Sequence, residues 1–235
     1  MMISLTWVAM TTSPVSCASD ELLPRVAANL ADVRARIGRA ARAPEGVRIV
    51  AVTKTFAPQM VRAASAAGLT NVAENYVDEL VEKRAATADL DLRWHFLGAL
   101  QSNKIRRVMA VADVLCAVSR VKEIELIARE RAGVTIYVQV DCTGATTRNG
   151  AAPREVADLV QHARERGLDV RGLMTVAPPD SRGAREAFHI TSDLADELTV
   201  IERSMGMSDD LELACEFGTT EVRVGRALFG PRTDQ

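Results

Sequence analysis

Several features that mark large classes of proteins are scarce in this sequence. Of its 235 residues 4% are aromatic, and 29 basic residues face 31 acidic ones, which gives a formal net charge of −2. Proteins usually bind nucleic acids through a broad basic face or stacking aromatic side chains, so we expect no nucleic-acid partner. No apolar run approaches the roughly 20 residues that span a bilayer, so we expect no membrane association.

Cysteines and histidines are few and widely separated. They show no CxxC pair and no metal-ligand spacing. They are Cys17, Cys116, Cys142, Cys215, His95, His162 and His189. A chain of this length buries a core without disulfide bonds, so we expect reduced thiols in a cytoplasmic protein and no metal site.

The first 20 residues do not share the pattern of the rest. An apolar stretch at 3–10 and small residues at 16–18 resemble a signal peptide, but no Lys or Arg precedes them. We therefore expect a disordered N-terminal extension over 1–20 rather than a secretory signal. The remaining residues, 21–235, show no linker and no second zone of composition, which predicts one domain.

Helical and extended patterns alternate along that domain. From about residue 21 a helix is indicated by apolar residues on one face, at Val26, Leu30, Val33 and Ile37, and a second helix opens at Pro58 and stops at Gly68. Strands are predicted at 48–53, 71–76, 93–98, 114–119, 134–141, 169–176, 199–204 and 220–225. Further helices are predicted at 76–86, 102–112, 120–132, 153–166, 183–197 and 208–217.

Eight strands that alternate with helices predict an α/β fold with a parallel sheet. Eight such units within one domain fit a single (β/α)8 TIM barrel better than an open doubly wound sheet. The seventh strand is the weakest, because residues 197–204 can also extend the preceding helix.

Lys54 comes directly after the first buried strand, between the apolar Val52 and Phe56. In a barrel of this kind the carboxyl ends of the strands form the active face. An amine held there away from water has a lowered pKa and can form a Schiff base with an aldehyde. A solvated lysine at the end of a strand is the ordinary alternative.

The loops after the last two strands are where barrels commonly bind phosphate. They read SMGMSDD and RVGRALFG, and each places a glycine before a helix, where backbone N–H groups can face an anion. Ser208 in the first loop can instead simply cap its helix. A lysine opposite a phosphate cup, with Arg223 on the last strand, favours pyridoxal phosphate, an aldehyde that carries a phosphate.

An ordered set of motifs extends over residues 25–232. The segments are AVTKTF, AENYVDEL, WHFLGALQSNK, RGLMTVAP, SMGMSDDLE and EVRVGRALFG, and together they resemble the pyridoxal phosphate homeostasis proteins. The resemblance implies a single barrel of the alanine racemase N-terminal-domain type. It also implies a protein of intracellular vitamin B6 homeostasis that holds pyridoxal phosphate as a lysine aldimine without strong turnover, with pyridoxal-dependent apoenzymes as recipients.

The resemblance also assigns roles around the cofactor ring. Lys54 carries the aldimine, Arg223 faces the pyridine nitrogen, and Asn75 lines the ring edge. Because an arginine is effectively always charged, Arg223 would keep that nitrogen unprotonated and make the ring a poor electron sink. The site would then store the cofactor rather than use it for catalysis, and no catalytic residue is expected.

For the phosphate, the resemblance assigns Ser204, Gly225 and the backbone N–H of Arg226. Many members have Ser or Thr at the position of Arg226, so this chain lacks one hydroxyl contact. The backbone N–H survives the change, and the positive charge could compensate if the side chain turned inward. The segment before Ser204 is also short, so the seventh strand could be shifted.

Two alternatives stay open for the function. One is a pyridoxal-dependent amino-acid racemase with weak activity, and the other is a barrel that has lost the cofactor. Alanine racemases add a C-terminal domain through which they pair, and they use a tyrosine of the partner subunit as the opposing acid and base. This chain contains only Tyr76 and Tyr137 and ends ten residues after Gly225, so we favour a monomer without strong activity.

Two polar residues near the predicted mouth have a structural as well as a functional interpretation. His95, between Trp94 and Phe96, could be a general base, but a histidine of the core is favoured. Glu74 is expected to form a structural ion pair with a neighbouring Lys or Arg.

Overall fold

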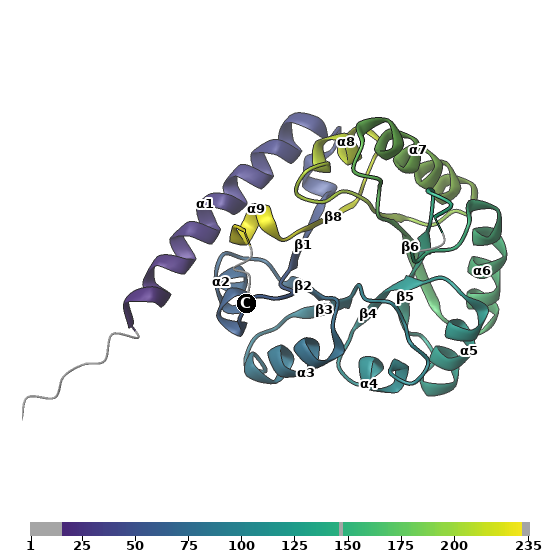
Figure 1. The fold of residues 1–235 in the computed structure, drawn as a ribbon, viewed down its shortest axis with the longest axis horizontal. Coiled ribbons are helices and arrows are strands. Elements are labelled where there is room, and N and C mark those ends of the chain that lie inside the picture. Colours follow the sequence, from purple (N-terminus) through teal and green to yellow (C-terminus); the bar gives the residue numbers. More distant parts are fainter. Residues whose placement is uncertain (1–15, 146–147, 232–235) are drawn as a thin grey trace, which may run out of the picture.

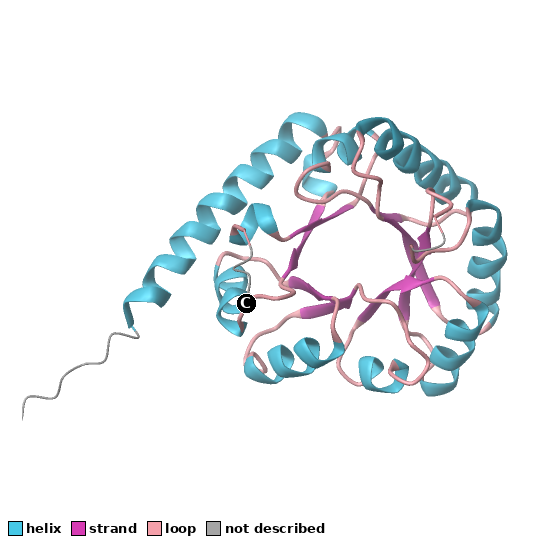
Figure 2. Cartoon of the chain, viewed as in Figure 1, coloured by secondary structure: helices cyan, strands magenta, loops and turns pink. Residues whose placement is uncertain are grey.

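The computed structural model describes residues 16–145 and 148–231. Eight parallel strands close into a barrel in which each strand pairs with the next along the chain, and β8 pairs with β1. Helices cover the outside of this barrel (Figures 1 and 2). The prediction of an α/β fold with a single (β/α)8 barrel is therefore confirmed.

The strands are short and lie close to the predicted ranges. They are β1 Arg48–Val52, β2 Asn71–Glu74, β3 Arg93–Phe96, β4 Val114–Val118, β5 Thr135–Val140, β6 Asp169–Thr175, β7 Glu202–Ser204 and β8 Glu221–Val224. The helices are α1 Ser16–Ala40, α2 Pro58–Ala66, α3 Val77–Ala86, α4 Ile105–Met109, α5 Val121–Glu130, α6 Pro153–Glu165, α7 Ser181–Glu197, α8 Leu211–Glu216 and α9 Arg226–Phe229, with a 3₁₀ turn η1 at Pro44–Gly46. No helix within the described ranges is both long enough and apolar enough to cross a membrane.

The seventh strand begins three residues later than the sequence pattern predicts. Helix α7 ends at Glu197, and Thr199, two residues later, has a φ of 52°, which lies in the left-handed region. The N–H of Val200 donates to the carbonyl of Ala195 at 3.0 Å, and the N–H of Thr199 donates to Asp196 at 3.2 Å. This is a Schellman motif, so residues that look extended in the sequence in fact end the helix.

The N-terminal boundary also differs from its predicted place. Helix α1 begins at Ser16, five residues before residue 21, so the predicted disordered extension does not reach residue 20. Residues 1–15 lie outside the described residues, and the extension over them stays a prediction. The apolar stripe of α1 is buried against the barrel, at Val26, Leu30, Val33 and Ile37.

Strand residues alternate between the outer core and the barrel interior. On β8, Val222 and Val224 pack in the core between strands and helices. Glu221 and Arg223, which alternate with them, are also buried, and their side chains bond to groups on neighbouring strands within the barrel. The interior therefore carries charge, and this charge forms the floor under the carboxyl ends of the strands.

A polar layer lies below Arg223 inside the barrel. The hydroxyl of Tyr137 donates to the carboxylate of Glu202, and the guanidinium of Arg48 donates to Glu202 and Glu221, each at 3.2 Å. Burial raises the pKa of Tyr137 well above its ordinary value.

Gly172 on β6 lets the backbone of β7 approach, since a Cβ there would lie 2.1 Å from the carbonyl oxygen of Glu202.

Candidate functional site

Lys54 leaves the end of β1 in a tight turn at the mouth of the barrel. Its side chain is half-buried, and the turn closes through a hydrogen bond of 3.0 Å from the N–H of Phe56 to the carbonyl of Thr53. Thr55 has a φ of 66°, a left-handed conformation that a β-branched residue seldom adopts. The backbone therefore takes a strained path beside the lysine.

Asn75 lies at the end of β2, the neighbouring strand. Gly98 packs against its backbone, since a Cβ on Gly98 would come within 2.1 Å of the Asn75 carbonyl oxygen. The side-chain Oδ1 of Asn75 is buried and has no hydrogen-bond partner among the described residues. A buried acceptor without a partner usually marks a site for a ligand or water, so this amide fits a role at the edge of a bound group.

Arg223 is locked in place by the strands on its side of the barrel. Its Nη1 donates to the carbonyl and the hydroxyl of Ser204 at 2.6 and 2.8 Å, and its Nη2 donates to the carbonyl of Thr175 at 2.7 Å. Burial lowers the pKa of its guanidinium below the ordinary value, while Glu221 acts in the opposite direction. The guanidinium can only donate hydrogen bonds, because it has no acceptor atom.

Ser204 is fully buried beneath this guanidinium. Its hydroxyl donates to Glu221 Oε1 at 2.7 Å and accepts from Arg223 at 2.8 Å. The hydroxyl proton is therefore directed to a carboxylate of the barrel interior. In this arrangement Ser204 supports Arg223, and its predicted role toward a phosphate stays a prediction without support from this geometry.

The N-terminus of α9 forms a second polar surface at the mouth. Gly225 passes close to β1, with its Cβ position 3.1 Å from the carbonyl oxygen of Val52. The N–H of Ala227 donates to the hydroxyl of Ser208 at 3.1 Å. Within the part of the chain that the structure describes, the N–H groups of Gly225 and Arg226 donate to no backbone or side-chain acceptor. Such N–H groups are suited to an anion.

The side chain of Arg226 turns away from this surface. More than half of it is exposed, and it forms an ion pair with Asp209. The inward turn that could have compensated for a missing hydroxyl is therefore not observed. The hydroxyl of Ser208 lies beside the N-terminus of α9 instead. The sequence places Ser208 in the loop after the seventh strand, with a helix cap as the alternative, but it does not show on which side of the loop the hydroxyl lies.

Comparisons with known proteins agree with this architecture. The family model of the alanine racemase N-terminal domain matches residues 23–233. A curated relative from Pseudomonas aeruginosa, the pyridoxal phosphate homeostasis protein, is 39% identical over 220 residues, which cover 88% of this chain and 96% of the relative. The chain belongs to the pyridoxal phosphate homeostasis protein family. The namesake from Escherichia coli strain K12 is 33% identical over 227 residues, 88% of this chain and 97% of the relative.

Solved structures resemble this member of the family over most of its own length. PipY of Synechococcus elongatus, in the structure with pyridoxal phosphate bound, has a TM-score of 0.75 and 31% identity, and the match covers 87% of this chain and all of PipY. An alanine racemase of Clostridium difficile is 18% identical with a TM-score of 0.72, and the match covers 91% of this chain and 58% of the racemase. The racemase likeness shows the shared barrel alone.

Two structural interpretations from the sequence are confirmed in this homeostasis-family barrel. His95 is fully buried, with Nε2 3.1 Å from Asn71 Oδ1 and Nδ1 3.7 Å from Cys116 Sγ. Burial lowers its pKa, which favours the neutral ring. Glu74 forms the expected ion pair, with Lys83 Nζ at 2.7 Å from its Oε1.

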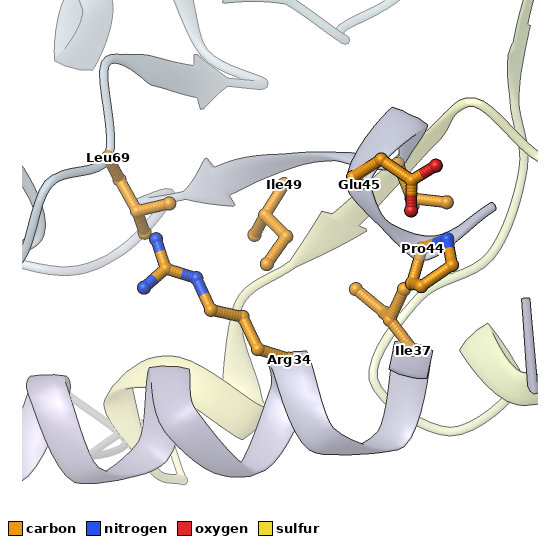
Figure 3. A pocket seen from close by; sticks show the side chains of 7 residues that line it. Arg34, Ile37, Pro44, Glu45, Ile49 and Leu69 are labelled. Carbon is orange, nitrogen blue, oxygen red and sulfur yellow. The ribbon is translucent and has the colours of Figure 1, made fainter. Parts of the chain in front are cut away.

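A cavity of about 410 Å³ lies away from the mouth of the homeostasis-family barrel. It is lined by residues of α1, η1 and the start of β1 and by Leu69, with Arg34 and Glu45 as its charged residues (Figure 3). None of the residues that line it belongs to the loops after the strands. The cavity follows from the packing of α1 across the amino end of β1, and it takes no part in the candidate site.

Proposed function

We propose that this chain binds pyridoxal phosphate at the mouth of the barrel and serves in intracellular vitamin B6 homeostasis. The observation that supports this most is that three kinds of functional group lie at the same end of the barrel. They are the amine of Lys54, a half-buried residue, the guanidinium of Arg223 held by hydrogen bonds, and N–H groups at the start of α9 without acceptors among the described residues. Relatives in the family carry this function in their names.

Each group has a distinct task in this proposal. When bound, pyridoxal phosphate supplies an aldehyde that condenses with a primary amine and, with a protonated ring nitrogen, an electron sink. Lys54 would supply the amine for that aldehyde. The N–H groups of Gly225 and Arg226, with the Ser208 hydroxyl beside them, hold the phosphate dianion. Asn75 Oδ1 faces the ring edge.

Arg223 accounts for the lack of strong turnover in this proposal. A charged guanidinium would donate to the pyridine nitrogen without passing it a proton, so the ring would be a weak acceptor of electrons. The two tyrosines do not replace a racemase acid. Tyr137 is buried and donates to Glu202, while Tyr76 is 55% exposed at the rim. We therefore infer a carrier or regulator rather than a racemase.

The same proposal includes the setting of the protein. We propose a cytoplasmic monomer that delivers the cofactor to apoenzymes. This rests on the family membership and on the thiols, which in the described residues are free, at Cys116, Cys142 and Cys215.

The decisive test uses the small number of lysines. The chain has four, and Lys83 is buried in ion pairs while Lys104 and Lys122 are exposed. Purified protein mixed with pyridoxal phosphate should show a visible absorption band that borohydride reduction removes. Peptide mapping should then place the reduced adduct on Lys54, in wild type and in Lys122→Ala alike, and Lys54→Ala should show no such band.

Two results would overturn the proposal. One is a wild-type protein that gains no band, and the other is an adduct spread over the exposed lysines. An assay with D- and L-alanine separates carrier from racemase, because the proposal expects no interconversion above that of free cofactor.

A further inference from the structure

A buried cluster from α3 grips the turn that carries Lys54. The ammonium of Lys83, whose side chain is 3% exposed, donates to the carbonyl of Thr53 at 2.7 Å. It also donates to Glu74 Oε1 at 2.7 Å and to Glu79 Oε2 at 2.6 Å. One ammonium group therefore serves three acceptors, on Thr53, Glu74 and Glu79. Thr53 is held by α3 through its carbonyl and by β2 through its N–H.

The other side of the turn is bound by the same cluster. Glu79 Oε2 accepts the N–H of Thr55 at 2.8 Å. Thr53 and Thr55 flank Lys54 in the sequence, so the backbone is anchored immediately before and immediately after the lysine. Such double anchoring fixes the backbone at Lys54 and thereby the direction in which its Cα–Cβ bond points.

The strain at Thr55 gives this anchoring a purpose beyond packing. The left-handed conformation of Thr55 is unfavourable for a residue with a Cβ, and such conformations persist only where surrounding contacts enforce them. The hydrogen bond from Thr55 N–H to a carboxylate is a contact of that kind. Without it, the turn can relax toward an ordinary conformation and Lys54 can change its direction.

We propose that Glu79 is a positioning residue for Lys54, which acts through Thr55 and is itself held by Lys83. This inference rests on the proposed function, in which the Lys54 amine must meet a ring whose other side is fixed by Arg223 and α9. Functional groups must be held within about 0.5 Å of their productive places, and Arg223 is already immobile. The accuracy of the site therefore depends on the turn.

The test compares three substitutions on the same helix. Glu79→Ala removes the acceptor for Thr55 N–H, and Glu79→Gln keeps an oxygen that can accept it. Glu82→Ala is the matched control, because Glu82 is an exposed glutamate of α3 with no ion pair among the described residues. Spectrophotometric titration with pyridoxal phosphate should show about tenfold weaker binding for Glu79→Ala, because the turn at Lys54 loses a hydrogen bond to a charged group, which stabilises its conformation by an amount of that order.

A second readout needs no cofactor. Amide hydrogen exchange over residues 54–56 should be faster in Glu79→Ala than in wild type or Glu82→Ala, since the Thr55 N–H loses its acceptor. Glu79→Gln should restore both slow exchange and most of the affinity. That rescue is not expected if Glu79 serves only the stability of α3 through its charge.

The outcomes separate the two proposals. If wild type binds and Glu79→Ala binds as Glu82→Ala does, the positioning role is wrong and the proposed function stands. If Glu79→Gln is as weak as Glu79→Ala, the hydrogen bond to Thr55 is not the means, and the positioning role is again wrong. If wild type takes up no pyridoxal phosphate on Lys54, the proposed function fails and this inference fails with it.

Discussion

Replacing Lys83 by methionine should destabilise the protein strongly although no part of the surface changes. Removing one partner of a buried ion pair typically costs about 3–5 kcal/mol, because the other charge stays buried without compensation. The side chains of Lys83 and Glu74 are 3% and 0% exposed, which places this pair in that class. Domains have unfolding free energies of about 5–15 kcal/mol, so Lys83→Met should fold at 25 °C with a reduced margin.

The state of Glu74 determines the size of the effect. Burial already raises the pKa of the Glu74 carboxyl above its ordinary value, and hydrogen bonds from Lys83 and Thr53 oppose this rise. Its Oε2 atom has no hydrogen-bond partner in the described part of the chain. In Lys83→Met the opposing contribution of the ammonium is lost, so the pKa of Glu74 rises further, with each unit equal to about 1.4 kcal/mol.

The pH dependence follows from the sign of this shift. A carboxyl whose pKa is higher in the folded state than in the unfolded state binds its proton more tightly when folded. Its contribution to stability is present below the unfolded pKa, near 4.3, and is lost as the pH rises through the folded value. The penalty of Lys83→Met should therefore be smaller at acidic pH than at pH 7.

Urea denaturation followed by circular dichroism measures these differences. At pH 7 the double variant Glu74→Gln with Lys83→Met should be more stable than Lys83→Met by at least about 1.5 kcal/mol, within the range of coupling between contacting residues. The exposed Lys122→Met provides the control for removing a lysine charge. Additive losses in the double variant, or a penalty independent of pH, would refute the reasoning.

Two further predictions concern single positions. Gly172→Ala should lower the free energy of unfolding by about 1–3 kcal/mol, because its Cβ would meet the Glu202 carbonyl at 2.1 Å, whereas Gly46→Ala, with open space around it, should be neutral in the same urea titration. Equal stability of these two variants would contradict the close approach of β6 and β7. Arg226→Thr should change the affinity for pyridoxal phosphate less than about threefold, under 1 kcal/mol, because the side chain faces Asp209 and solvent. A tenfold loss by spectrophotometric titration would show that the charge reaches the phosphate.

The sequence predicts the barrel well because its signals are local and repeated. Alternation of apolar strands with helices is enough to count eight units, and the positions of Lys54 and Arg223 follow from the rule that strand ends form the active face. The start of β7 is missed because the Schellman motif depends on a left-handed conformation at Thr199. Threonine seldom adopts that conformation, so its presence in the sequence does not indicate the motif. Residue types alone give no indication of that left-handed turn.

The details of the site are less accessible for a different reason. Whether Ser204 or Ser208 faces α9 depends on which way two nearby hydroxyls turn, and their partners, Glu221 and Ala227, lie 17 and 19 residues away. The contact of Lys83 with Thr53 spans 30 residues. Such contacts arise from the packing of elements that are separate in the sequence, and they leave no pattern in the neighbouring residues.

The hydrogen bonds that hold Arg223 have a consequence for any exchange with other proteins. Its guanidinium is fastened to β6 and β7 by the protein's own carbonyls and hydroxyl, so its place does not depend on an occupant. Binding and release of the cofactor would leave the barrel interior unchanged, so the interior would not differ between the cofactor-bound and the cofactor-free protein. If the protein delivers the cofactor as proposed, a recipient that distinguishes the loaded from the empty form would have to recognise the rim, at the loops that carry Lys54 and Ser208.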